Sequence, residues 1–439
     1  MNTYKLILSF IFLVFASRSW AQNDTMSFSI LEALDYAVAN NTQMKNAYAD
    51  IAIADQTVKE VKAIGIPQLR GQVAFQDALQ KPVFVFPING VATPIRVGNK
   101  YTTQATLNAT WLMLDGTYFL GLKAAKQYTD LAKRVAAKTE ADIKIDVAKT
   151  YFLALITKEN ISLVDTSYST LNKTLTNIKA LNREGFTESL DVDRMQLQIN
   201  NLEISRQQLL DQYTIVLGLL KVKMGLAQDK PIRLTDNISD INSKFMVADT
   251  SAEISFSGRT DYQILQQQLV LNKYSVKRYQ YGKYPNLAAA YTYQQSNFGE
   301  TVDYSTWYSN SFVALQLNVP IFSGFANDAK IQQAKIEQIK TENSIAQAEN
   351  AMRLEVMQSR LRYLRAFDYV EQQKSNLDLA TRILNVTTIK YNEGVGSNLE
   401  LITANQDLKT TQTNYFNALY DLLVAKLDYQ IALGQTLKI

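Results

Sequence analysis

Cysteine and histidine are both absent from this sequence of 439 residues. Without cysteine the chain can form no disulfide bond and offers no thiol for lipid attachment. Without histidine it lacks the commonest general base and the commonest metal ligand. No nucleophile-base pair and no metal-binding motif stands out among the other residues. We therefore expect no enzymatic activity, no cofactor and no metal site.

Glycine, proline and an excess of either charge are also scarce. The chain has 16 glycines and 7 prolines, and 45 basic residues nearly balance 41 acidic ones to give a formal net charge of +4. The charge balance gives no indication of nucleic acid binding, and the lack of helix breakers favours long helices. Beyond the N-terminus no apolar run approaches the roughly 18 residues of a membrane helix. Any part that spans a membrane must therefore consist of strands.

The N-terminus has the pattern of a secretory signal peptide. Lys5 precedes an apolar core at residues 6–15, and Ser19-Trp20-Ala21 fits a cleavage site of the small-x-small type. We expect residues 1–21 to direct Sec-dependent export and to be removed.

An apolar repeat of seven residues marks the last part of the chain. It opens at Gly394 and closes at Gly434, and its large residues are Leu401, Leu408, Tyr415, Leu422 and Tyr429. The same pattern occurs between Gly185 and Gly225, so that matching glycines lie 209 residues apart. A seven-residue period keeps one helix face against a partner helix. Two copies of one helical module indicate an internal repeat.

Four segments alternate apolar and polar residues, as amphipathic strands do. Their polar side is rich in threonine, glutamine and asparagine. The predicted strands are about 67–76, 101–113, 286–295 and 307–319. We expect a long, exposed loop from Asp77 to Lys100 in the first pair and a shorter loop from Ser296 to Ser305 in the second.

Helices are predicted before and after each pair of strands. The segment after each pair is long enough for a helix of about 97 Å, a length that globular domains rarely contain. The predicted helices are about 30–64, 118–182 and 190–225 in the first half, and about 261–283, 325–391 and 399–434 in the second. A break at Asn40-Asn41 divides the first of them.

The order helix, strand, strand, very long helix and helix thus occurs twice. We predict a first structural repeat at 22–226 and a second at 259–439. The more polar segment 227–258 is expected to be a linker packed against the outside of the helices. The fold class is therefore an α+β membrane protein with two internal repeats.

Four strands cannot enclose a lumen, because an open sheet leaves unpaired backbone groups at two edges. In lipid each unpaired group costs several kcal/mol, so other copies of the chain must close the sheet, and a trimer would supply three times four strands. Aromatic residues near the strand ends fit the interfacial girdles of such a barrel: Phe75, Tyr101, Trp111, Tyr291, Tyr293, Trp307, Tyr308 and Phe312. An ordinary β-sandwich is the alternative, but the second face is too uniformly polar for a buried sheet.

Two motifs carry a resemblance to a known family. Residues 317–324 (LNVPIFSG) precede the second long helix, and residues 391–394 (YNEG) precede residues 399–404 (LELITA). With the internal repeat, these motifs make nearly the whole mature chain resemble the TolC-type outer membrane efflux proteins. The resemblance implies a homotrimer, with a twelve-stranded β-barrel in outer membrane lipid and a long periplasmic α-helical barrel. It also implies an export duct that joins a periplasmic adaptor (membrane-fusion) protein and an inner-membrane transporter of the RND, MFS or ABC type.

The resemblance further places the two glycine turns at a periplasmic tip that is closed at rest. The family's latch joins an aspartate to a tyrosine and an arginine. Asp191 and Tyr391 match the first two, whereas Gly396 stands at the arginine position, so Arg194 or Arg183 is the expected substitute.

The resemblance also implies an acidic constriction and an adaptor-docking surface at this tip. At the constriction Glu400 matches the first acidic position and Thr403 replaces the second. The adaptor is expected to dock at the turns, at Gly185, Gly394 and Gly396, although Glu184 and Glu393 replace the valine of the family pattern.

Plainer interpretations of these carboxylates stay open. Glu400 and Asp191 lie at predicted helix starts, where the helix dipole favours negative charge. Calcium ligation by Asp191 and Asp193 is a further hypothesis. For the whole chain, a structural periplasmic coiled-coil scaffold or adhesin stalk competes with the export duct.

Overall fold

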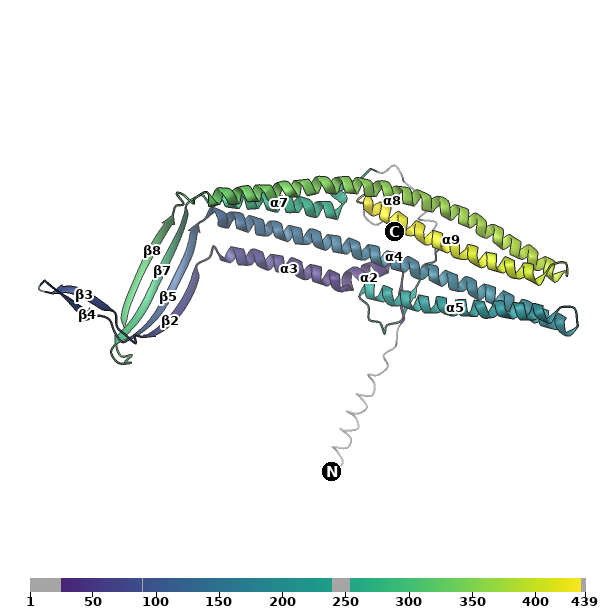
Figure 1. Cartoon of the computed structure of the whole chain (residues 1–439), viewed down its shortest axis with the longest axis horizontal. Helices are drawn as coiled ribbons and strands as arrows, with labels where there is room; N and C mark the ends of the chain where they lie inside the picture. Colours follow the sequence, from purple (N-terminus) through teal and green to yellow (C-terminus); the bar gives the residue numbers. More distant parts are fainter. Residues whose placement is uncertain (1–24, 89, 239–252, 436–439) are drawn as a thin grey trace, which may run out of the picture. The chain divides into compact units, whose positions relative to one another are not determined.

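Figure 1 shows the computed structural model of the chain, which describes residues 25–88, 90–238 and 253–435. These residues divide into two compact units. The helical unit holds the described residues of 1–48, 135–263 and 348–439, and the sheet unit holds those of 49–134 and 264–347. The predicted signal peptide and the middle of the predicted linker, residues 239–252, lie outside the described residues.

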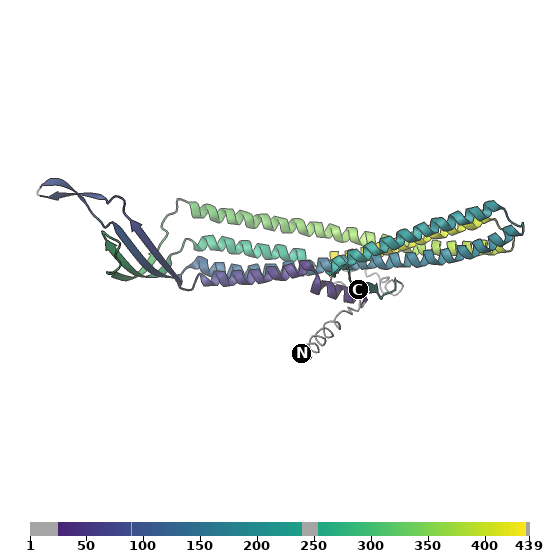
Figure 2. The same cartoon turned by 90° about the horizontal axis from the view of Figure 1, so that it is seen from below.

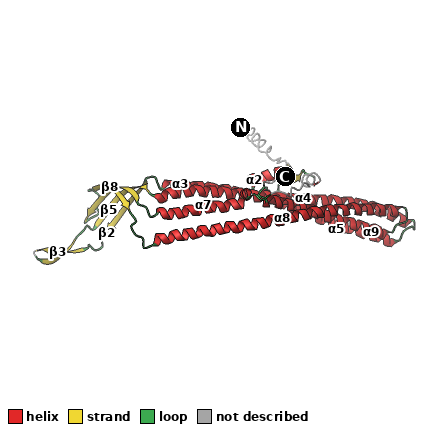
Figure 3. Ribbon diagram, turned by 90° about the horizontal axis from the view of Figure 1, so that it is seen from above, coloured by secondary structure: helices red, strands yellow, loops and turns green. Residues whose placement is uncertain are grey.

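Most of the described chain is helical, in keeping with its few glycines and prolines (Figure 3). Two helices are far longer than the others: α4 (Gly116–Arg183) has 68 residues and α8 (Ala326–Asn392) has 67. The other described α-helices are α2 (Ile30–Asn40), α3 (Thr42–Ala63), α5 (Ser189–Met224), α7 (Thr260–Tyr281) and α9 (Asn398–Ala432). Asn41 separates α2 from α3, and its amide Nδ2 donates to the carbonyl oxygen of Lys223 at 2.7 Å.

The sheet unit contains an open antiparallel sheet in the order β2-β5-β7-β8. Its strands are β2 (Gln68–Asp77), β5 (Tyr101–Leu114), β7 (Asn286–Gly299) and β8 (Tyr308–Asn318). Within the described residues β2 and β8 are edges without a partner strand. The pairing of β5 with β7 joins segments that lie far apart in the sequence.

Strand register divides this sheet into two faces. Leu69, Ala109, Tyr291 and Val313 lie side by side across the four strands, so their side chains share one face. That face is apolar, and Leu69 and Val313 are 67% and 74% exposed. A β-sandwich would bury such a face, so this alternative is wrong for the described chain. The opposite face carries threonine, glutamine and asparagine.

The predicted loop between Asp77 and Lys100 is wrong in one respect, because it contains a β-hairpin. Strand β3 (Val83–Ile88) pairs with β4 (Val91–Arg96), with Phe84 opposite Ile95. The alternation of large apolar residues in V-F-V-F-P-I supports extended structure. The prolines and glycines between Asp77 and Lys100 favour a loop in the sequence, but proline is tolerated on the edge strands of a hairpin.

The helical unit is built from two helical hairpins, α4 with α5 and α8 with α9 (Figure 1). The predicted seven-residue pattern faces inward, since Leu401, Leu422 and Tyr429 are at most 3% exposed. One buried cluster joins α4, α5 and α9: Val164, Leu171, Leu175, Ile178, Met195, Ile199, Leu202 and Leu401. A second joins α8 and α9 and includes the stacked rings of Tyr363 and Tyr429, whose centroids lie 6.0 Å apart.

The described ends of the predicted linker pack within the helical unit. Strand β6 (Ile232–Leu234) pairs in parallel with β1 (Met26–Phe28). The hydroxyl of Tyr151 is 2.9 Å from the carbonyl oxygen of Phe28 and 2.8 Å from the Asp236 carboxylate. Burial, and then the Asp236 carboxylate, raises the pKa of Tyr151, so this hydroxyl stays neutral.

Gly225 closes α5 in a backbone conformation that few other residues adopt. Its φ is +72°, and a Cβ there would lie 2.6 Å from the carbonyl oxygen of Asn40. Gly185 has a φ of +83° but open space around it. The two glycines therefore share one backbone requirement and differ in packing.

We expect Gly225→Ala to lower the free energy of unfolding by about 2–5 kcal/mol, because left-handed strain adds to the clash with Asn40. Gly185→Ala is the matched control, with an expected loss of about 1–2 kcal/mol from strain alone. Chemical denaturation of the detergent-purified full-length variants, followed by circular dichroism, measures both. Equal losses in the two variants would contradict the role assigned to the packing.

Candidate functional site

The two glycine turns lie next to each other at the same end of the helical unit (Figures 1 and 2). Each turn reverses the chain between a long helix and its returning helix. Gly185 and Gly394 have φ angles of +83° and +75°, which are readily accessible to glycine. The backbone N–H groups of Phe186 and Val395 donate to carbonyl groups of the preceding helix at 2.9 and 3.0 Å, and so satisfy acceptors at its end.

A buried asparagine links the two hairpins beside these turns. Nδ2 of Asn398, in the first turn of α9, donates to the carbonyl oxygen of Asp191 at 2.9 Å and to its Oδ1 at 3.2 Å. Asp191 lies in the first turn of α5, and Asn398 is only 4% exposed. A hydrogen bond to a neutral carbonyl contributes roughly 0.5–1.5 kcal/mol and one to a charged carboxylate roughly 1.5–3 kcal/mol. These bonds therefore tie the start of α5 to the start of α9.

Tyr391 lies close to this link without joining it. Its ring packs against the buried cluster of α4, α5 and α9. Its hydroxyl is buried and has no hydrogen-bond partner within the described chain. Burial, and then the negative charge of Asp191, raises the pKa of Tyr391. The hydroxyl is therefore a neutral donor that is still available for a bond.

The structure gives no support for an arginine in the link. Arg194 is exposed on α5 and forms no ion pair among the described residues. At Gly396 a Cβ would lie 2.9 Å from the backbone nitrogen of Tyr391, so this position has no room for a larger side chain. Asn398, which the sequence analysis missed, makes the bond instead. Its only sequence signal is an amide at a helix start, seven residues before Asn405 in the heptad pattern.

Glu400 and Thr403 both lie on the first turns of α9. The N–H of Glu400 donates to Ser397 Oγ, the N-cap of α9, at 3.1 Å. The Glu400 carboxylate lies 3.8 Å from Lys390 Nζ, and both side chains are about half exposed. Thr403 Oγ1 donates to the carbonyl oxygen of Leu399 at 2.9 Å. The accessible carboxylate fits both an aperture role and the favourable field of the helix N-terminus.

Several aromatic residues of the sheet do lie near strand ends. Phe75 stacks on Tyr101 with 6.0 Å between ring centroids, at the end near the β3–β4 hairpin. Trp111 lies toward the other end of β5, where its Nε1 donates to the carbonyl oxygen of Gly65 at 3.1 Å. Trp307 precedes β8 and stacks on Tyr304.

The sequence prediction misplaced other aromatic residues. Tyr291 and Tyr293 lie in the middle of β7, because this strand continues to Gly299 rather than ending near residue 295. Tyr308 and Phe312 pair with Ser296 and Thr292 and therefore lie on the polar face. Tyr308 does begin β8, as predicted, whereas Tyr291, Tyr293 and Phe312 lie inside their strands.

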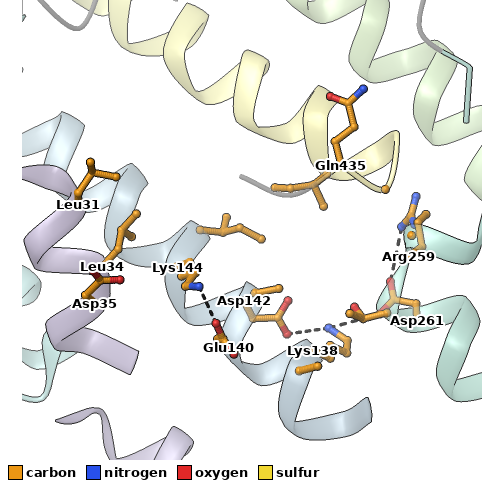
Figure 4. A pocket seen from close by; sticks show the side chains of 17 residues that line it. Leu31, Leu34, Asp35, Lys138, Glu140, Asp142, Lys144, Arg259, Asp261 and Gln435 are labelled. Carbon is orange, nitrogen blue, oxygen red and sulfur yellow. Dashed lines mark hydrogen bonds and ion pairs between the residues drawn. The ribbon is translucent and has the colours of Figure 1, made fainter. Parts of the chain in front are cut away.

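The helical unit also contains a cavity of about 410 Å³ (Figure 4). It lies among α2, α4, the start of α7 and the end of α9. Its lysines are already paired, since Lys138 lies 2.6 Å from Asp142 and Lys144 lies 2.5 Å from Glu140. We assign no ligand to this cavity, because its cationic groups already have partners.

Across the described ranges, no cluster of three or more acidic side chains is suited to hold a metal ion. In the same ranges, no helix combines the length and the apolar character that a membrane span requires.

Comparison with known proteins relates both the sequence and the fold to one class. Residues 260–435 match the family model of the outer membrane efflux proteins. The fold is similar to that of the outer membrane protein VceC from Vibrio cholerae, with a TM-score of 0.71, 15% identity, and coverage of 92% of this chain and 96% of that one. No curated protein sequence matches the chain significantly.

Two further solved structures have the same fold. The Campylobacter jejuni CmeC outer membrane channel has a TM-score of 0.71 and 14% identity, and coverage is 92% of this chain and 85% of that one. The open state of the Neisseria gonorrhoeae MtrE outer membrane channel has a TM-score of 0.69 and 15% identity, with coverage of 92% and 89%. The fold is thus that of an outer membrane channel. The predicted resemblance is confirmed: residues 260–435 match the family model of the outer membrane efflux proteins, and the fold matches solved structures of such channels.

Proposed function

We propose that this chain is one subunit of an outer membrane export duct. The observation that carries the proposal is the open four-stranded sheet, whose apolar face is exposed while its opposite face is polar. Alternating faces of this kind suit a barrel wall with lipid outside and water inside. In an aqueous periplasmic stalk this apolar face would be exposed to water, which is unfavourable.

Ring closure by a homotrimer follows from the two unpaired edges. Strand β2 of one copy pairs with β8 of the next, so that three copies give three times four strands and no edge remains. The long helices of the three copies continue the barrel as a periplasmic helical tunnel. Residues 1–21 serve as the signal for Sec-dependent export, and the two repeats are 22–226 and 259–439 with the linker 227–258 between them.

The two glycine turns form the periplasmic entrance in this proposal. The bond between Asn398 and Asp191 holds the entrance closed at rest, and the unpaired hydroxyl of Tyr391 is a reserve donor beside it. A periplasmic adaptor docks on the turns around Gly185, Gly394 and Gly396. The adaptor joins the duct to an inner-membrane transporter of the RND, MFS or ABC type, which passes small molecules or polypeptides to the outside.

Conductance in a planar lipid bilayer tests the duct directly. We expect the detergent-purified full-length protein to migrate as a trimer and to conduct small ions. A strictly monomeric mass in mild detergent would overturn the proposal. Extraction without detergent together with no conductance would favour the periplasmic scaffold or adhesin stalk instead.

Glu400 is expected to favour cations at the entrance, because three copies place three exposed carboxylates around it. Glu400→Gln removes these charges and should shift the reversal potential, in a salt gradient, toward that of a non-selective pore. Glu203→Gln removes the same charge from an exposed position on α5 away from the two turns and is the matched control. If Glu400→Gln has unchanged selectivity, the carboxylate of Glu400 does not select ions. Its role would then be limited to a favourable interaction with the dipole at the N-terminus of α9.

A further inference from the structure

The β3–β4 hairpin carries apolar side chains that nothing in the described chain covers. It extends past the ends of β2 and β5 (Figures 1 and 2). Phe84 and Phe86 are 52% and 45% exposed, and their ring centroids lie 6.3 Å apart on one face. Register adds three aliphatic neighbours to this face: Ile88, Val91 and Ile95. We call these five side chains the hairpin face.

The base of the hairpin is fixed to the sheet. The backbone N–H of Ala78 donates to Lys100 at 2.7 Å, and that of Val97 donates to Pro82 at 3.0 Å. Lys81 also forms an ion pair with Glu300, which follows β7. These contacts continue the pairing of β2 with β5 into the hairpin, so the hairpin face has a defined place beside the edge strand β2.

A hairpin of this composition needs a covering surface, since two strands alone are marginally stable in water. No residue from 83 to 95 is charged. Pro87 and Pro94 have no N–H to donate, which makes the strand edges poor templates for another strand. Side-chain packing on the hairpin face is therefore the mode of contact that remains. The absence of charge also makes an anionic lipid headgroup a poor partner.

A matching apolar surface lies at the opposite edge of the same sheet. The connection from β7 to β8 exposes Val302, Tyr304 and Trp307, with Tyr304 52% exposed. Register places this connection at the same end of the sheet as the hairpin, because Tyr101 pairs with both Asp77 and Gly299. The hairpin follows edge strand β2, and the connection precedes edge strand β8.

We propose that the hairpin face of one copy packs on Val302, Tyr304 and Trp307 of the neighbouring copy. The inference rests on the proposed ring, in which β2 of one copy lies beside β8 of the next. The hairpin and the connection then meet at every subunit junction, just beyond the strands. We call this contact between the hairpin face of one copy and Val302, Tyr304 and Trp307 of the next the clasp. It adds apolar packing to the pairing of β2 with β8.

The absence of native cysteine makes this contact testable by cross-linking. Phe84→Cys and Tyr304→Cys are placed on separate, differently tagged full-length chains and expressed together. A short bismaleimide reagent is added to the purified protein in detergent and again in lipid vesicles. We expect a covalent dimer that carries both tags. Phe84→Cys with Leu317→Cys, which lies at the far end of β8, is the control pair and should not cross-link.

Each outcome has a distinct meaning. A protein that forms no trimer contradicts the proposed function itself. A normal, conducting trimer in which both thiols react with maleimide but form no mixed dimer overturns the clasp alone. Cross-links only between two Phe84→Cys chains would overturn it too, because the hairpins would then meet one another.

A second variant measures what the contact contributes. Phe84→Ser combined with Phe86→Ser should lower the temperature at which the trimer dissociates in dodecyl sulfate. Leu79→Ser is the control, because Leu79 is 91% exposed, precedes β3 and lies outside the hairpin face. Equal dissociation temperatures for the double variant and the unmodified protein would overturn the clasp.

Discussion

Val313→Lys should abolish insertion and assembly of the trimer. Val313 lies at the middle of β8, is 74% exposed and shares the apolar face with Tyr291. A lysine at the mid-plane of a barrel costs about 2–4 kcal/mol, so three copies lose about 6–12 kcal/mol per trimer. The measurement is the amount of heat-resistant trimer in isolated outer membranes.

Gln316→Lys is the matched control for this substitution. Gln316 lies three residues along the same strand, is also exposed and points to the polar face. A lysine there faces water in the proposed barrel and should leave the amount of trimer close to normal. Equal loss in both variants would show that the apolar face does not contact lipid.

Asn398→Ala should raise the resting conductance of the trimer in a planar bilayer. The substitution removes both hydrogen bonds from Asn398 to Asp191, which join the first turns of α5 and α9. The hydrogen bond to the Asp191 carboxylate contributes roughly 1.5–3 kcal/mol, and the proposed trimer contains three copies of it. Since 1.4 kcal/mol is a factor of ten in an equilibrium, the loss of even one bond shifts the closed-open balance by about tenfold or more.

Asn405→Ala is the control that separates the loss of the Asn398–Asp191 bonds from a general loss of packing in α9. Asn405 is 8% exposed and, within the described residues, donates along its own helix to the carbonyl oxygen of Leu401 at 2.9 Å. It should leave the resting conductance near that of the unmodified protein. The gate assignment fails if Asn398→Ala folds as a trimer and conducts no more at rest than Asn405→Ala does.

The elements with a strong period were predictable from the sequence. The alternation of Thr102, Gln104 and Thr106 with apolar residues predicted β5, and the heptad through Leu401 predicted a buried face of α9. Strand ends were less predictable. β7 continues to Gly299 because its last residues find partners on β5, a tertiary contact that local alternation does not reveal.

The candidate site was harder to predict than the fold. Asp191 was correctly placed at the start of α5, but its partner Asn398 lies 207 residues away and follows no local pattern. Gly396 was recognised as a departure from the arginine of the family pattern. Its physical reason, close packing on the end of α8, required the backbone geometry around Tyr391.

If three copies close the sheet as proposed, the two edges that have no partner strand within the described residues also predict how mutant alleles behave. In a ring of three copies, one chain with a distorted edge strand disrupts the closure of the whole barrel. In a cell that makes equal amounts of normal chain and of a chain that enters the ring but distorts its seam, random assembly leaves about one eighth of the trimers fully normal. Such alleles should therefore be dominant, whereas alleles that never reach the ring should be recessive.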